Sequence, residues 1–149
     1  MNEIWTAERK MLAEMTCQKW HGTKHRNRMN QVGVGIDCIQ LVKEILTDAG
    51  IIDPCKLSSY DVNDGTHNVS QRLALAISYA LDVESVSIET VAFGDLAIFR
   101  TGTRSGHVGF CTEDAIWHAL AGQCVTKSKF NLWKHEIDTL YRIKSIGLK

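Results

Sequence analysis

The stretch GVGIDCIQLVKEILTDAG, residues 33–50, carries the clearest structural signal in the chain. Its apolar side chains recur at helical spacing and predict a helix that ends at Gly50, because glycine commonly terminates helices. This apolar stripe consists of Cys38, Leu41, Val42, Ile45, Leu46 and Ala49. Cys38 falls in the first turn, where unpaired N–H groups and the positive end of the helix dipole lower a thiol pKa. Cys38 is therefore a candidate nucleophile, and a plain buried cysteine is the alternative.

The rest of the chain predicts helices first and strands later. Residues 4–20 are expected to form an amphipathic helix with Ile4, Met11, Leu12 and Met15 on its apolar side, and Gly22 is expected to stop it. Residues 51–68 are expected to form an irregular connection. A third helix is marked by Leu73, Ala76, Ile77, Ala80 and Leu81. Apolar residues then recur at every second position, which predicts strands at 86–88, 95–100, 107–111, 115–120 and 140–146. This order indicates a single α+β domain, residues 1–149, with N-terminal helices packed on a central antiparallel β-sheet.

The segment HVGFCTEDAIWHA, residues 107–119, resembles a β-hairpin that carries a histidine on each strand. If a two-residue turn joins the strands, His118 lies opposite Gly109, and His107 and His118 project from the same face. His107 could then act as a base for Cys38, and His118 could fix the tautomer of His107. Gly109 between them would leave room where the base meets the thiol. A three-residue loop would send the two rings to opposite faces, and two unrelated histidines at a sheet rim are the alternative.

The balance of charge argues against some partners. Seventeen Lys and Arg residues match seventeen Asp and Glu residues, so the formal net charge at pH 7 is zero. Without a positive field to attract a polyanion, nucleic acid is not expected as a partner. No stretch reaches the roughly 20 apolar residues of a membrane-spanning helix, and the N-terminus lacks the apolar core of a signal peptide. We therefore expect no membrane contact and synthesis in the cytoplasm without a signal peptide.

The cysteines and histidines do not predict a metal site or a cofactor. The five cysteines form an odd set without the spacing of a secreted disulfide framework. Cys17, His21 and His25 would align on one continuous helix, but Gly22 interrupts it and no Cys-x-x-Cys pair is present.

Several short motifs occur in an order that resembles the NlpC-type cell-wall peptidases, which are papain-like cysteine peptidases. The motifs span most of the chain: Trp20-His21-Gly22-Thr23, Gly35-Ile36-Asp37-Cys38, Gly94-Asp95, His107-Val108-Gly109 and His118-Ala119. The closing Trp133 and the Tyr141-Arg142 pair look similar to the end of the members associated with phage tails.

This resemblance implies a papain-like NlpC-type fold in which Cys38 is the nucleophile, His107 the base and His118 the residue that orients the base. The residues expected near the substrate are Trp20, His25, Asp37 and Gly109. The implied reaction is hydrolysis of peptidoglycan stem peptides between D-glutamate and a diamino acid. The implied partners are the stem peptide and phage tail proteins, and the implied location is a virion tail acting on the periplasmic cell wall.

The sequence also departs from the family pattern. Lys24 and His25 replace a Pro-Tyr pair that helps to shape the substrate cleft, Gln40 replaces a small residue, and Phe93 replaces a proline. Gln40 and the altered loop at Lys24 and His25 leave open a structural tail-tip component with a peptidase-derived fold and little activity. A third possibility is an antibacterial amidase toxin that is delivered to rival cells.

Overall fold

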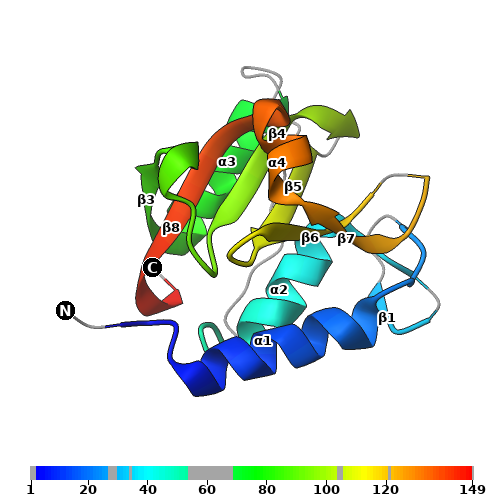
Figure 1. Cartoon of the computed structure of the whole chain (residues 1–149), viewed down its shortest axis with the longest axis horizontal. Helices are drawn as coiled ribbons and strands as arrows, with labels where there is room; N and C mark the ends of the chain where they lie inside the picture. The colour runs from blue at the N-terminus through cyan, green and yellow to red at the C-terminus, as the bar shows by residue number, and fades with distance from the viewer. Residues whose placement is uncertain are drawn as a thin grey trace.

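A computed structural model describes residues 3–26, 30–33, 35–53, 69–103, 106–120 and 122–148 (Figure 1). The irregular connection expected over 51–68 lies largely outside these residues. The helices are α1 (Ala7–Trp20), α2 (Cys38–Asp48), α3 (Val69–Ala80) and the short α4 (Phe130–Trp133), with 3₁₀ turns at Ile88–Thr90 and Lys134–Glu136. In the described part of the chain no helix is long and apolar enough to cross a membrane.

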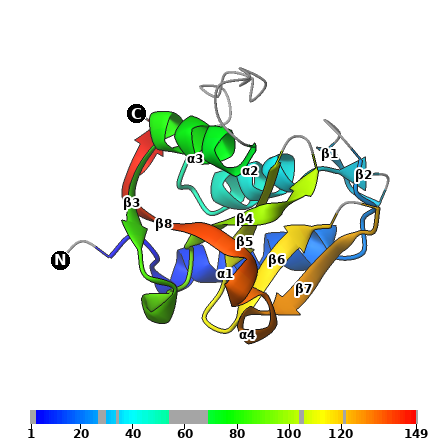
Figure 2. The same cartoon turned by 90° about the horizontal axis from the view of Figure 1, so that it is seen from above.

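A six-stranded antiparallel sheet forms the centre of the fold. Its strand order is β3-β8-β4-β5-β6-β7, and a separate two-stranded sheet pairs β1 with β2. The strands are β1 (Asn30–Gln31), β2 (Gly35–Ile36), β3 (Leu81–Val86), β4 (Leu96–Thr103), β5 (Gly106–Cys111), β6 (Ala115–Ala119), β7 (Val125–Lys129) and β8 (Ile137–Leu148). Helices α2 and α3 pack against the sheet, and α1 packs against α2 (Figures 1 and 2). The predicted α+β architecture is confirmed.

Apolar side chains divide between the two faces of the sheet. The face toward the helices buries Val108, Phe110, Trp117 and Ala119, as the hairpin pattern predicts. The other face has a second cluster consisting of Ala97, Phe99, Cys111, Ile116, Phe130, Ile137 and Leu140. Alternation along β5 and β6 therefore places the histidines on the face away from the helices.

The first helix differs from its expected form. It begins at Ala7, after Thr6 caps it by accepting a hydrogen bond from the backbone N–H of Arg9. Its buried face consists of Ala13, Thr16, Cys17 and Trp20. Met11 and Met15, which were expected on the apolar side, are exposed. The expected face was wrong, because the helix turns Ala13 and Cys17 into the core cluster that also holds the apolar side chains of α2.

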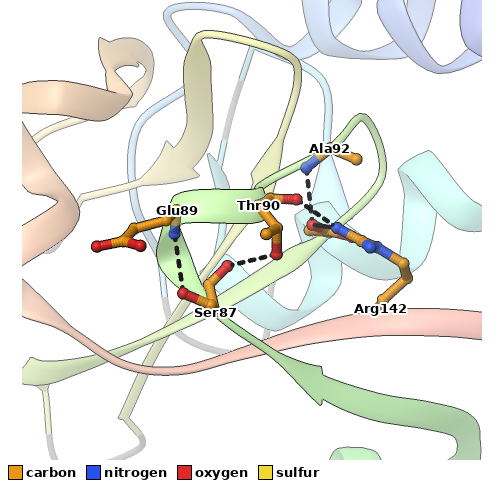
Figure 3. Close-up of polar contacts among 6 residues, drawn as sticks. Ser87, Glu89, Thr90, Ala92 and Arg142 are labelled. Atoms are coloured by element: carbon orange, nitrogen blue, oxygen red, sulfur yellow. Dashed lines mark hydrogen bonds and ion pairs between the residues drawn. The ribbon is translucent and has the colours of Figure 1, made fainter.

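The strand expected at 86–88 was also wrong. β3 spans Leu81–Val86 and ends at Ser87, whose hydroxyl accepts the backbone N–H of Glu89 and begins a 3₁₀ turn (Figure 3). Strand β7 was not predicted, because its sequence VTKSK has one buried apolar residue, Val125, and lacks an apolar alternation.

An ion pair connects the turn after β3 to the last strand, β8. Asp95 is buried and accepts two hydrogen bonds from Arg142, at 3.0 and 2.9 Å. Arg142 also donates to the carbonyl of Thr90, and Asp95 accepts from the backbone N–H of Ala92 (Figure 3). The Gly94-Asp95 motif is thus a structural corner that joins β4, β8 and the turn after β3.

Candidate functional site

Cys38 is the first residue of α2, and the residue before it caps the helix. Asp37 has extended backbone angles, and its carboxylate accepts the backbone N–H of Gln40 at 2.8 Å. Its carbonyl accepts the N–H of Leu41 at 3.0 Å, which begins the helical hydrogen-bond series. Aspartate is among the preferred residues at this position, so the local sequence fixes Cys38 in the first helical turn.

Burial dominates the electrostatics of the thiol. The Cys38 side chain is only 4% exposed, and this desolvation raises its pKa to about 12. Hydrogen bonding to the backbone of Val108, and of Cys38 and Ile39 at the helix start, opposes the rise, whereas the charge of Asp37 adds to it. The expected lowering of the thiol pKa was therefore wrong in sign, because the cost of burying a thiolate exceeds the stabilisation by the helix start.

The hairpin places the two histidines as predicted. Phe110 pairs with Trp117, and the N–H of Thr112 donates to the carbonyl of Ala115 across a two-residue turn. In this register His118 lies opposite Gly109. The Nε2 atom of His107 is 2.9 Å from Nδ1 of His118, so the two rings share a hydrogen bond.

The second ring nitrogen of His118 also has a partner. Its Nε2 atom lies 2.8 Å from the hydroxyl of Ser128 on β7. A continuous polar chain therefore runs from His107 through His118 to Ser128. Local sequence patterns do not reveal Ser128, because the strand that carries it lacks an apolar alternation.

Burial keeps both imidazoles neutral near pH 7. Desolvation lowers the pKa of His107 to about 3, with smaller contributions from the charges of His118 and His25. Desolvation lowers the pKa of His118 to about 4. A neutral imidazole has an open nitrogen lone pair for a proton, but a pKa this far below neutrality makes it a weak base in the free protein.

Aromatic rings enclose the histidine pair. Phe99 on β4 lies 4.9 Å from the ring of His107 and 5.8 Å from that of His118, measured between centroids. Trp133 stands perpendicular to His118 at 4.9 Å. These contacts exclude water from one side of the pair and hold the plane of each ring.

The thiol lies beside the strand that carries His107. The sulfur of Cys38 reaches the backbone of Val108, the residue after His107, and α2 packs against β5 and β6. The nucleophile candidate and the base candidate therefore come from neighbouring points of a helix start and a strand. A base within hydrogen-bond reach of a thiol can activate it for attack on a carbonyl.

The residues expected near the substrate have different environments. The ring of Trp20 is only 2% exposed and packs in the helix-side core, so it offers no surface for substrate stacking. Asp37 has the capping role described above. His25 is half-buried, and its effect on the pKa of His107 places it near the pair.

The space beside Gly109 is occupied by neighbouring side chains of the protein. A Cβ atom at this position would lie 2.5 Å from Cγ2 of Ile116 and 3.4 Å from both Phe99 and the Cβ of His118. The space that was expected for the meeting of thiol and base is thus filled by neighbouring side chains. Gly109 allows His118 and Phe99 to pack closely on the strand.

The geometry also bears on the possible metal ligands. Helix α1 ends at Trp20, so Cys17, His21 and His25 do not share one helical face. Within the described ranges, no group of three His, Cys, Asp or Glu side chains is arranged to hold a metal ion.

Comparison of the sequence with protein-family models and with curated proteins gave no match. Comparison of the structure found a solved protein from Staphylococcus aureus subsp. aureus Mu50, described as similar to lipoprotein and of the NLP/P60 family. The TM-score is 0.62 and the sequence identity 19%, over 93% of this chain and 42% of that one. The present chain thus spans less than half of that protein. The likeness establishes the fold, which is the papain-like arrangement expected from the sequence.

Proposed function

We propose that this domain is a cysteine peptidase that cleaves peptidoglycan stem peptides, with Cys38 as nucleophile, His107 as base and His118 as the residue that orients the base. The observation that carries the proposal is the 2.9 Å contact between the two histidines, next to the strand backbone that receives the thiol. The fold shared with an NLP/P60 protein supports it.

The hydrogen bond between the two histidines indicates which nitrogen of His107 would take the proton of Cys38. Because Nε2 of His107 contacts His118, Nδ1 is the nitrogen that would take the proton from Cys38. The sulfur then attacks the amide carbonyl carbon, and the backbone N–H of Cys38 at the helix start stabilises the oxyanion. His107 returns the proton to the leaving amine, and water hydrolyses the acyl-enzyme.

The pKa values describe the resting state. With the pKa of the thiol at about 12 and that of His107 at about 3, both groups are neutral before substrate binds. Proton transfer therefore accompanies the attack and does not precede it. Alkylation of Cys38 in the free protein should be slow at neutral pH and should accelerate as the pH rises.

The bond between D-glutamate and a diamino acid is the proposed point of cleavage, by resemblance to the NlpC-type peptidases. The zero net charge of the chain fits a zwitterionic peptide better than a polyanion. A phage tail is the proposed setting. A toxin delivered to rival cells would use the same chemistry, and the genes that neighbour this one would separate the two settings.

Digestion of purified sacculi tests the proposal. Mass spectrometry of the soluble products should show stem peptides that end in D-glutamate, and the Cys38→Ala variant should release none. Cys124→Ala is the matched control, since Cys124 is a partly exposed free cysteine and should be dispensable. Equal digestion by the wild type and the Cys38→Ala variant would refute the assignment.

The small exposed area of Cys38 favours a second candidate, a structural tail component with little turnover. In that case sacculi stay intact, and iodoacetamide fails to label Cys38 even in alkaline buffer, whereas Cys124 is labelled. Labelling of Cys38 in alkaline buffer together with stem-peptide release would exclude the structural role.

A further inference from the structure

Ser128 occupies the far end of the polar chain that begins at His107. It lies on β7 opposite Ile116 in the register, so its side chain projects from the same face as that of His118. Its hydroxyl oxygen is 2.8 Å from Nε2 of His118. We propose that Ser128 is a positioning residue that fixes the orientation and tautomer of His118. This inference rests on the proposed peptidase function.

The tautomer required for catalysis determines what Ser128 must do. For His107 to accept the thiol proton at Nδ1, its Nε2 must carry a hydrogen and donate it to Nδ1 of His118. His118 must then carry its own hydrogen on Nε2, and Ser128 accepts that hydrogen. His118 is fully buried, so without this hydroxyl its N–H would lose its partner at a cost in free energy.

Ring packing alone cannot replace this hydrogen bond. Phe99 and Trp133 contact His118 through ring faces and edges, and these contacts fix the plane of the imidazole. They distinguish poorly between the two orientations that exchange ring nitrogens with ring carbons. The Ser128 hydroxyl makes this distinction, because it bonds to a nitrogen and not to a carbon.

The same chain supports the charge that forms during the reaction. When His107 takes the proton from Cys38 it becomes a cation next to neutral His118. Hydrogen bonds in series polarise one another, so the bond to Ser128 strengthens the acceptor that faces His107. Removal of the hydroxyl should therefore affect turnover more than substrate binding.

The test compares Ser128→Ala, Ser128→Thr and the wild type on a soluble stem peptide. Ser128→Ala should lower kcat by roughly tenfold, the effect of losing one hydrogen bond of ordinary strength in the transition state, and leave KM unchanged. Ser128→Thr keeps the hydroxyl on a residue that strands favour, and should restore most of kcat. Thr126→Ala, on the same strand and face, is the matched control and should behave like the wild type.

A second measurement does not depend on activity. In ¹⁵N-histidine spectra, His118 of the wild type should show a protonated Nε2 and an unprotonated Nδ1. Ser128→Ala should shift these signals toward a mixture of tautomers, and Ser128→Thr should keep them.

The outcomes separate this inference from the proposed function. A wild type that releases no stem peptides refutes the proposed function and the role of Ser128 with it. An active wild type whose Ser128→Ala variant keeps kcat and the ¹⁵N signals overturns only the role of Ser128. Equal loss of kcat in Ser128→Ala, Ser128→Thr and Thr126→Ala also overturns it, because the strand would then act merely as scaffold.

Discussion

Gly109 shows how one missing side chain shapes the site. The contact with Ile116 leaves no space for a Cβ atom at this position, and Phe99 and His118 close the other sides. Gly109→Ala should lower the free energy of unfolding by about 1–3 kcal/mol, the usual cost of overpacking, and should disturb the ring of His118. Denaturant titration measures the change in the free energy of unfolding, and kcat on a stem peptide reports the disturbance of His118.

A double variant tests whether the clash with Ile116 causes the loss of stability in Gly109→Ala. Ile116→Ala removes the Cγ2 atom that the new Cβ would meet, so Gly109→Ala should cost less in the Ile116→Ala background than in the wild type. Additive losses would show that the clash is not the source of the destabilisation.

At the same scale, the sequence predicted some residues of the site and missed others. The parity of a hairpin is determined by its turn, so the common face of His107 and His118 could be predicted on the assumption of a two-residue turn, which the structure confirms. Ser128 and Phe99 join the pair only through strand neighbours distant in sequence, which a local pattern cannot reveal. The burial that raises the Cys38 pKa likewise depends on the whole packed domain.

Among the elements, helix α2 connects stability to thiol chemistry through its cap. Asp37→Ala removes the acceptor for the Gln40 N–H and should lower the free energy of unfolding by about 1 kcal/mol. Asp37→Asn keeps an acceptor oxygen but removes the charge that raises the pKa of Cys38. This variant should stay near wild-type stability, and iodoacetamide should alkylate its Cys38 faster at a given pH.

Asp48→Asn removes a charge at the opposite end of the same helix and serves as the control. It should leave the alkylation rate of Cys38 unchanged. A rate increase as large as that of Asp37→Asn would show that net charge, and not the position of Asp37, controls the thiol.

Strand β8 depends on the ion pair between Arg142 and buried Asp95. Arg142→Met leaves the Asp95 carboxylate without its two guanidinium bonds and should lower the free energy of unfolding by about 2–3 kcal/mol. The control is Arg100→Met, which removes a more exposed pair with Asp138 at 4.0 Å and should cost about 1 kcal/mol or less. Thermal and denaturant unfolding measure the stability of both variants. Equal losses in the free energy of unfolding would contradict a special role for the buried carboxylate.

The elements most visible in the sequence are those with a strong apolar period. Helix α2 appears at its predicted place because its stripe is unbroken and Asp37 caps it. Strand β7 went unnoticed because its pairing with β6, and not its own composition, makes it a strand. The strand expected at 86–88 failed for a local reason, since Ser87 turns the chain before the apolar period can continue.

For the whole molecule, the buried histidines link stability to pH. The pKa of His107 is about 3 and that of His118 about 4 in the folded protein, compared with about 6.5 for an unfolded histidine. Below pH 6.5 the unfolded chain therefore binds protons that the folded chain does not. The free energy of unfolding should be highest above this pH, and should fall by about 1.4 kcal/mol per histidine for each pH unit as the pH approaches 4.

Carboxylates also titrate in acid, so the contribution of the pair must be taken as a difference between proteins. The double variant His107→Gln/His118→Gln should show a shallower fall in the free energy of unfolding between pH 6 and pH 4 than the wild type does. His21→Gln, at an exposed site, should leave the slope unchanged. Denaturant midpoints at a series of pH values provide the measurement. Parallel slopes for the wild type and the double variant would mean that the pair takes up protons in the folded state as readily as in the unfolded state. In that case burial would not have lowered the pKa values of the two rings as the structure indicates.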